Sequence, residues 1–454
     1  MAFFFLSSAK RISFSVSSQL PQYENNGDDV LQRVGGVRSH ARQLVFEIRK
    51  IHNAKYQPRI VALLKELGFE FQTYWITNSI LVKNVTPGLI KTLRYIPEII
   101  ELELNKDIAF IDPVVESVSE VEASKARVSE WNVEIIGAHN VWNVTTGEGI
   151  TSANIDTGVL YTHVALIDNY RGNNGGGSFS HDYNWFDPRG IYQYPYDNNG
   201  HGTHTMGTIA GSEASGVGVA PGTKWIAAKG CASSSCATVD LIASAQWVIC
   251  PTTQAGTSPD CARGADLINN SWGGGRGSST YKTYIQAWID AGSVPLFSQG
   301  NAGPSCSTAN SPGDLAIVIG VGSTNRNDAL SSFSSRGPGV GTVDFPLQKP
   351  DISAPGESVR SSYYTSNTAY ATLSGTSMAC PAVAGLTALL MSANPSLSVA
   401  NIREILVSTA KQGLAVPNGG LATCNGISYL TYPNYHYGWG RIDAVKALQA
   451  ALKF

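Results

Sequence analysis

The chain has 454 residues, with 32 Lys and Arg against 34 Asp and Glu and a formal net charge of −2. With this balance the chain has no excess of positive charge, which disfavours nucleic acids and membrane surfaces as partners. Only 15% of the residues are charged and 46 are Gly, which is typical of a compact body with many tight turns. The length suits one large core with a small companion domain.

The first 40 residues are polar, rich in Ser and without periodicity. Their apolar run, Ala2–Leu6, is shorter than the core of a secretory signal and far shorter than a membrane span. We therefore expect residues 1–40 to be a disordered or targeting segment without a fold of its own.

Residues 41–112 show the pattern of a small α+β domain. The sequence predicts helices at 57–68 and 86–96, the second capped by Thr86, and strands at 44–51, 69–76, 79–85 and 99–105. The order β-α-β-β-α-β is that of a ferredoxin-like unit, which many unrelated proteins share. The polar, acidic residues 113–130 follow and have the composition of an exposed, cleavable linker.

From residue 131 to residue 454, apolar runs alternate with helical segments. The pattern predicts strands at 150–156, 223–229, 264–272, 293–299 and 316–323, and helices at 202–210, 239–248, 281–291 and 378–391. This alternation indicates an α/β fold, with a mostly parallel sheet and helices on both faces. Active groups in such a fold lie beyond the carboxyl ends of the strands.

Seven cysteines have spacings that match no zinc ribbon. The close pairs Cys231/Cys236 and Cys250/Cys261 lie in stretches rich in Gly, Ser and Thr, as loop disulfides do, and indicate an oxidising compartment. Buried reduced thiols in an intracellular protein are the alternative.

Two candidate catalytic residues stand at element boundaries. Asp156 ends a predicted strand and precedes Thr157 and Gly158, a triplet that could equally be a turn or half of an aspartic-protease pair, although no second such triplet occurs. His201 stands between two glycines where a helix begins, which leaves its side chain at the mouth of the site. A zinc pair with His204 would have the wrong spacing and no intervening Glu, so we expect a structural role for His204.

Ser377 and Asn301 are two further candidate site residues. A serine at the start of a helix is ordinarily an N-cap, but there the helix end and a backbone N–H also face an oxyanion formed on a substrate. Ala379 stands where G-x-S-x-G would require a second glycine, which argues against an α/β-hydrolase elbow. Asn301, flanked by glycines at a strand end, is equally compatible with a plain turn.

Together these residues could supply the nucleophile, base, carboxylate and oxyanion donors of acyl transfer. The motifs IDTG, GHGTHTMGTIAG, GVGVAP, NNSWGG, QGNAG, DISAPG and GTSMACP follow one another in this order between Trp131 and Phe454. The set resembles the subtilisin-like serine peptidases, and most closely their bacillopeptidase F-like branch.

The resemblance implies the roles of the site residues. Ser377 would be the nucleophile, His201 the general base and Asp156 the orienting carboxylate, with the Asn301 side chain and the Ser377 N–H as the oxyanion hole. Residues that resemble the family's substrate-pairing edge and the facing wall of its first specificity pocket are Ser271, Trp272, Gly273, Ser298, Gln299 and Gly300. Trp272 is bulkier than the more common Leu.

By the same resemblance, residues 41–112 are an inhibitory propeptide whose sheet packs on the peptidase domain at 131–454. The linker 113–130 would lie in the cleft, paired with residues 271–273. The stretch 212–216 is too short for the loop that binds a strong calcium ion in bacterial relatives, so that site is not expected. No cofactor is predicted, and the sequence does not indicate whether calcium binds elsewhere. Cys380, in the nucleophile's helix, is expected to be buried and unpaired, which leaves six cysteines for up to three disulfides.

We therefore expect a monomeric serine endopeptidase that acts on polypeptides and is made as a self-processing zymogen, with its own propeptide as inhibitor. Its location would be extracellular or vacuolar/lysosomal. A catalytically inactive subtilisin-like binding protein is one alternative. An esterase or amidase acting on small molecules is another, because the same triad attacks esters.

Overall fold

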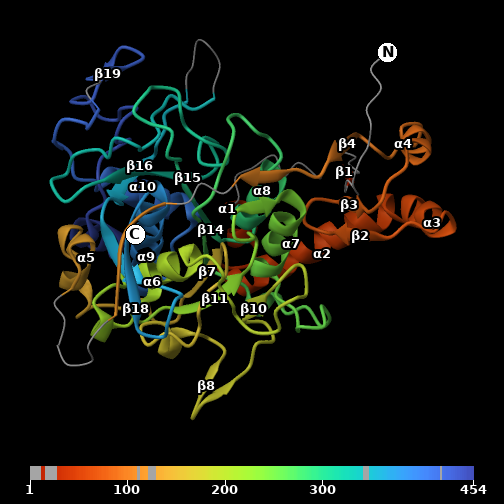
Figure 1. The fold of residues 1–454 in the computed structure, drawn as a ribbon, viewed down its shortest axis with the longest axis horizontal. Coiled ribbons are helices and arrows are strands. Elements are labelled where there is room, and N and C mark those ends of the chain that lie inside the picture. The colour runs from red at the N-terminus through yellow and green to blue at the C-terminus, as the bar shows by residue number, and fades with distance from the viewer. Residues whose placement is uncertain (1–11, 16–27, 110–112, 121–128, 341–346, 420–421) are drawn as a thin grey trace.

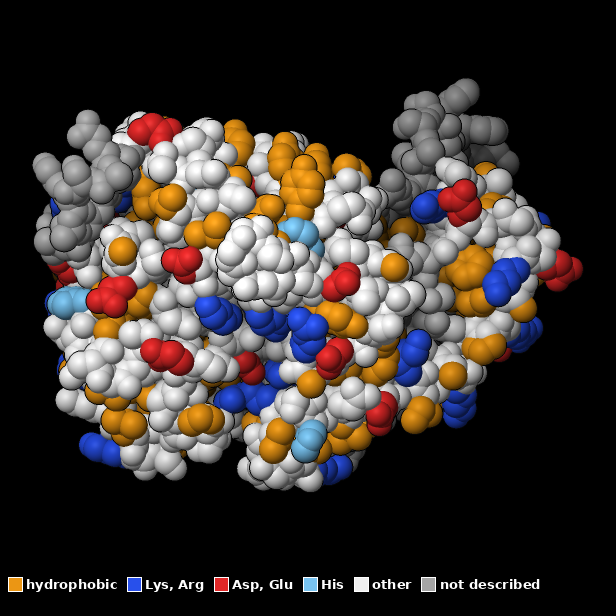
Figure 2. Space-filling model, turned by 90° about the horizontal axis from the view of Figure 1, so that it is seen from below, with side chains coloured by type: hydrophobic (Ala, Val, Ile, Leu, Met, Phe, Trp, Pro, Cys, Tyr) orange, Lys and Arg blue, Asp and Glu red, His pale blue; other side chains and the backbone are white. Residues whose placement is uncertain are grey.

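The computed structural model describes residues 12–15, 28–109, 113–120, 129–340, 347–419 and 422–454. It consists of a large α/β body and a smaller N-terminal lobe that projects from one side (Figure 1). Acidic and basic side chains are interspersed on the face shown in Figure 2, in keeping with the small net charge.

The large body is built on a parallel sheet of seven strands in the order β10-β11-β7-β13-β14-β15-β16. In that order the strands are Trp185–Phe186, Lys224–Ala228, Thr151–Ile155, Leu267–Asn270, Val294–Ser298, Ile319–Thr324 and Ile352–Pro355. Strands β13, β14 and β15 are buried along their whole length, as expected for a parallel sheet covered on both faces. The predicted α/β fold is confirmed.

Helices cover both faces of this sheet. One hydrophobic cluster includes residues of α6, α9, α10 and α11, and another includes residues of α7 and α8. The bounds are α6 His201–Ala210, α7 Thr238–Ile249, α8 Lys282–Asp290, α9 Thr376–Ala393, α10 Val399–Ser408 and α11 Ala444–Ala451. Helix α9 is long and apolar enough to cross a membrane, but 89% of it is buried inside the body, so it is a core helix.

The N-terminal lobe has a four-stranded antiparallel sheet in the order β2-β3-β1-β4, the order of a ferredoxin-like unit. Its elements are β1 Ile12–Ser15, α1 Asp28–Arg33, α2 Arg38–Tyr56, α3 Pro58–Glu66, β2 Phe71–Tyr74, β3 Ser79–Val82, α4 Pro87–Leu93 and β4 Glu101–Leu104. Thr86 caps α4 as predicted, because its side chain accepts a hydrogen bond from the Leu89 N–H at 3.2 Å.

Two predictions for this lobe are wrong. The strand expected at 44–51 lies inside helix α2, where buried residues recur at positions 41, 45, 49 and 53 and so form one helical face. The missing strand is β1, which pairs with both β3 and β4. Because β1 and α1 lie within residues 1–40, that segment is not wholly without structure.

The lobe packs against the large α/β body through a shared core. Val45, Tyr74 and Leu81 belong to the same hydrophobic cluster as Trp247 and Trp288 of the body. A second cluster, confined to the lobe, is formed by Ile60, Leu64, Ile80, Val82, Leu89, Leu93 and Ile96. The lobe therefore has a core of its own and an apolar face that docks on the larger domain.

Two short strands flank residues 110–112, one at the end of the predicted propeptide domain and one in the predicted linker 113–130. Strand β5, Asp107–Ala109, pairs with β12, Ser235–Ala237, and places Ile108 beside Gly274. Strand β6, Val114–Glu120, pairs with β18, Ala369–Ser374, of the hairpin that β18 forms with β17, Val359–Ser362. The expected pairing with residues 271–273 is absent among the described residues, and residues 110–112 lie outside them.

All three disulfides of the described residues lie in the large α/β body. They join Cys231 to Cys236, Cys250 to Cys261 and Cys306 to Cys424. The two predicted loop disulfides are confirmed, and Cys380 is buried and free as expected.

Candidate active site

Asp156 stands directly after β7 and is 1% exposed. Its backbone N–H donates to the Ala228 carbonyl at 3.1 Å, and its Oδ1 accepts a hydrogen bond from the Thr157 N–H at 2.7 Å. The carboxylate is therefore held at the carboxyl end of the sheet, where a parallel sheet gathers its functional groups.

His201 is the first residue of α6. Gly200 before it has φ 99°, a left-handed conformation that favours glycine and turns the chain into the helix. The His201 Nδ1 lies 2.7 Å from Asp156 Oδ1. Because the carboxylate accepts, Nδ1 carries the proton, which leaves Nε2 as the basic nitrogen on the far side of the ring.

Asp197 holds the loop that precedes His201, and sequence analysis missed it. Its Oδ1 accepts hydrogen bonds from the Asn199 and Gly200 N–H groups at 3.0 and 2.9 Å and from Thr157 Oγ1 at 2.9 Å. Its Oδ2 accepts from the Thr203 N–H at 2.9 Å. One buried carboxylate thus links the Asp156 and His201 segments. The Asp-Asn-Asn-Gly run before His201 was the available signal, since Asp and Asn commonly hold turns.

Two buried bases lie close to this network. Burial lowers the pKa of the Lys229 ammonium, which donates to Asn198 Oδ1 at 2.8 Å and to the Thr157 carbonyl. Burial also lowers the pKa of His204 to about 3. The neutral His204 ring lies 3.1 Å from the carbonyls of Val359 and Ala371, which fits the structural role expected for it.

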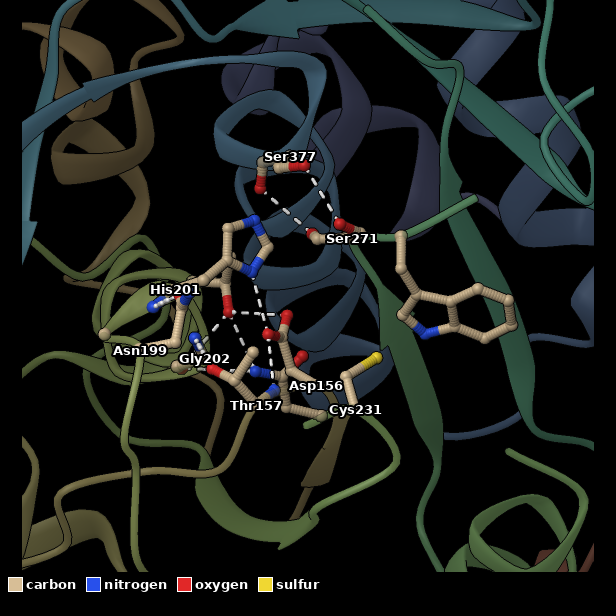
Figure 3. Close-up of polar contacts among 12 residues, drawn as sticks. Asp156, Thr157, Asn199, His201, Gly202, Cys231, Ser271 and Ser377 are labelled. Atoms are coloured by element: carbon tan, nitrogen blue, oxygen red, sulfur yellow. Dashed lines mark hydrogen bonds and ion pairs between the residues drawn. The ribbon is translucent and has the colours of Figure 1, made fainter. Parts of the chain in front are cut away.

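Ser377 is the second residue of α9. Its Oγ donates to the Ser271 carbonyl at 2.9 Å, and Ser271 Oγ donates back to the Ser377 carbonyl at the same distance. These bonds tie the start of α9 to the end of β13. The imidazole of His201 lies between the Asp156 carboxylate and the Ser377 hydroxyl (Figure 3).

Asn301 follows the left-handed Gly300, whose φ is 108°. Its Oδ1 accepts hydrogen bonds from Thr376 N–H at 2.9 Å and Thr376 Oγ1 at 2.8 Å. Because that oxygen is engaged, the orientation of the amide is fixed and its NH₂ group remains as a donor. A Cβ at Gly375 would lie 3.3 Å from Asn301 Nδ2, so the donor lies next to the turn that carries Ser377.

A narrow pocket joins most of the predicted residues. Its lining consists of Ser271, Trp272, Gly273, Ser298, Gly300, Asn301, Asn310, Thr376 and Ser377. Gln299 is not part of the lining, and its buried side chain lies against Gly320 instead. Asn310 was not predicted.

The indole of Trp272 is directed into the core. Its Nε1 donates to the Ile155 carbonyl at 3.0 Å, and its rings meet Tyr281 and Phe297 edge-on. The bulky side chain therefore packs in the core beneath the pocket and does not fill the pocket itself. Within the described part of the chain, no three His, Cys, Asp or Glu side chains form a group that could hold a metal ion.

The site therefore combines a hydroxyl at a helix start, an imidazole oriented by a buried carboxylate, and an amide donor beside that hydroxyl. These are the groups that acyl transfer requires, with base and nucleophile on adjoining elements. The arrangement is suited to attack on a carbonyl carbon and stabilisation of the resulting oxyanion.

Comparisons with known proteins agree with this chemistry. Residues 147–440 match the model of the subtilase family, peptidase S8. The chain is 34% identical over 401 residues to bacillopeptidase F of Bacillus subtilis, covering 84% of this chain and 26% of that protein. It is 32% identical to alkaline serine exoprotease A of Vibrio alginolyticus, covering 73% and 55%.

Subtilisin DY of Bacillus licheniformis is 35% identical over 290 residues, which cover 63% of this chain and 92% of that protein. The chain thus spans a quarter to a half of the length of bacillopeptidase F and of exoprotease A, but nearly all of a subtilisin. It belongs to the subtilase family of serine peptidases.

Proposed function

We propose that the protein is a serine endopeptidase that hydrolyses peptide bonds of polypeptides through Ser377, His201 and Asp156. One observation carries the proposal: the His201 imidazole is bonded to a buried carboxylate at 2.7 Å and presents its other edge to the Ser377 hydroxyl (Figure 3). Family membership supports the same class of reaction.

In the proposed mechanism, Ser377 Oγ turns from the Ser271 carbonyl, gives its proton to His201 Nε2 and attacks the substrate carbonyl carbon. The tetrahedral oxyanion accepts hydrogen bonds from the Ser377 N–H and the Asn301 amide. His201 then gives the proton to the leaving amine, and the C–N bond breaks to leave an acyl-enzyme. Water, activated by the same imidazole, releases the acyl group. Asp156 orients the ring and stabilises its positive charge.

We also propose that the chain is a zymogen that processes itself, with its N-terminal lobe as the inhibitor. Strand β5 pairs with β12 and places Ile108 beside Gly274, next to the pocket residue Gly273, and β6 pairs with β18 and places Val114 opposite Ser374, three residues before Ser377. The lobe's apolar face docked on the body supports the inhibitory role.

Three disulfides support an oxidising location, extracellular or vacuolar/lysosomal. A monomeric state is part of the same proposal.

The test is digestion of an unfolded protein by the matured chain, with the Ser377→Ala protein as control. We expect internal peptide bonds to be cut by the first and not by the second. Hydrolysis of small esters without cleavage of proteins would favour an esterase. No hydrolysis of either substrate by a matured, folded chain would favour an inactive binding protein.

A further inference from the structure

Strand β6 occupies the whole edge of β18. Its register runs from Glu120 opposite Ala369 to Val114 opposite Ser374, and Ser374 precedes the candidate nucleophile by three positions. In Figure 1, β6 is the orange strand beside β18. All six residues of β18 are therefore paired with β6.

Two glutamates of β6 are held by hydroxyl groups of the β17–β18 hairpin. Glu116 accepts hydrogen bonds from Ser374 Oγ and, at 2.9 Å, from Ser358 Oγ. Glu120 accepts from the side chains of Ser366 and Thr368, each at 2.8 Å. Glu116 lies at a β-bulge, where β6 has one more residue than β18. The hairpin therefore binds β6 through these two side chains as well as through the backbone.

The strand is tethered to the peptidase body on its carboxyl side. The Glu130 N–H donates to the Gly216 carbonyl at 2.8 Å, and the Glu130 carboxylate accepts from Arg360 Nη1 at 2.8 Å. A short tether of this kind keeps a released strand at an effective concentration on the order of millimolar. A cut between β5 and β6 would therefore leave β6 attached close to its docking edge.

The direction in which β5 and β6 run indicates which part of a substrate would bind the edge of β18 if β6 were absent. Strand β5 comes first along the chain and places Ile108 beside Gly274, and β6 comes second and places Val114 opposite Ser374. A substrate that lies in the same direction has its amino side on β12 and its carboxyl side on β18, where it adds as a strand. Strand β6 and the carboxyl side of a long substrate therefore compete for one edge.

Resting on the proposed endopeptidase function, we propose that β6 stays paired with β18 after the precursor is cut and limits cleavage of chains that extend far beyond the scissile bond. The preferred substrates are then peptides with few residues on the carboxyl side of the cut. Val114, Val115 and Val118 are at least half exposed, so little apolar surface is buried and docking is reversible.

The test uses two fluorogenic peptides with the same amino side. The short one carries an amide-linked dye directly after the scissile bond, and the long one carries eight further residues and a quencher. In the variant Glu116→Ala/Glu120→Ala, we expect kcat/KM for the long peptide to rise about tenfold, because the competing strand loses all the hydrogen bonds that the two carboxylates accept, most of them exposed to solvent. The short peptide should be cut at an unchanged rate. The control Ser117→Ala/Ser119→Ala keeps both carboxylates and should change neither rate.

An equal effect of the variant on both peptides, or none on the long one, would overturn the proposal. Hydrogen exchange on the matured wild-type chain tests it without variants: slow exchange at 114–120 supports docking, and exchange as fast as in a free peptide overturns it. Mass spectrometry that placed the mature N-terminus after Glu120 would overturn it as well. A wild-type chain inactive on the short peptide would contradict the proposed function, while hydrogen exchange would still decide the docking.

Discussion

Arg42 should carry much of the affinity between the N-terminal lobe and the peptidase body. The residue is 4% exposed, and its guanidinium donates to the carbonyls of Cys261 at 2.9 Å and Ala265 at 3.1 Å. It also forms an ion pair with Asp266 at 3.2 Å. These partners all belong to the body, so replacing Arg42 should leave the fold of the lobe intact.

Truncating one partner of a buried, hydrogen-bonded charge pair at an interface costs about 2–5 kcal/mol. We use the lower end because water can reach Asp266 once the guanidinium is gone. At about 1.4 kcal/mol per tenfold, Arg42→Ala should then raise the inhibition constant of the separate lobe about 30-fold.

The assay titrates residues 1–112 into the matured enzyme and follows hydrolysis of a chromogenic peptide. This segment includes β1, which lies inside the lobe's sheet, so residues 41–112 alone should inhibit more weakly. The matched control is Arg59→Ala, because Arg59 is 66% exposed and pairs with Glu98 inside the lobe. Its effect should stay below about threefold, as for an exposed ion pair. A similarly small effect of Arg42→Ala would refute the reasoning.

Three further predictions concern the body. Asn301→Ala should lower kcat about 10²–10³-fold with little change in KM, the known cost of removing this donor from a subtilisin; a loss below tenfold in steady-state kinetics would mean that the amide does not face the oxyanion. Ser377→Ala should abolish peptide hydrolysis and leave the precursor uncut, and a purified variant that matures normally would contradict self-processing. His204 has its pKa lowered from 6.5 to about 3, so as the pH falls below 6.5 the unfolded chain takes up a proton that the folded chain does not. The contribution of His204 to the free energy of unfolding therefore falls between pH 6.5 and about pH 3, by up to about 1.4 kcal/mol per pH unit. Urea unfolding of the Ser377→Ala protein at pH 7 and 4.5, with and without His204→Gln, checks this, and equal pH dependence of the two would contradict it.

The parallel core and the candidate site could be predicted because both leave local signals. Buried strands such as β14 are continuous apolar runs that end in a polar residue. Gly200 and Gly300, which precede His201 and Asn301, have positive φ values, and these backbone turns place the two side chains in the site. The motifs therefore identified the residues that the structure brings together.

The missed features depend on contacts between distant parts of the chain. Strand β1 has four residues and is stabilised by pairing with β3 and β4. Its short, Ser-rich sequence does not indicate that these strands are its partners. Helix α2 buries Arg42 and Arg49 because the body supplies carbonyls and carboxylates for them. Without those partners, the apolar residues at 44–46 looked like a strand.

Labelling with a fluorophosphonate tests the central claim most directly. The account predicts one covalent adduct in the matured chain, located on Ser377 by peptide mass mapping, with hydrolysis of proteins lost in proportion to labelling. A His201→Ala variant should be labelled far more slowly, because the hydroxyl then lacks its base. An active, unlabelled chain, or an adduct on another residue that accompanies the loss of activity, would contradict the account.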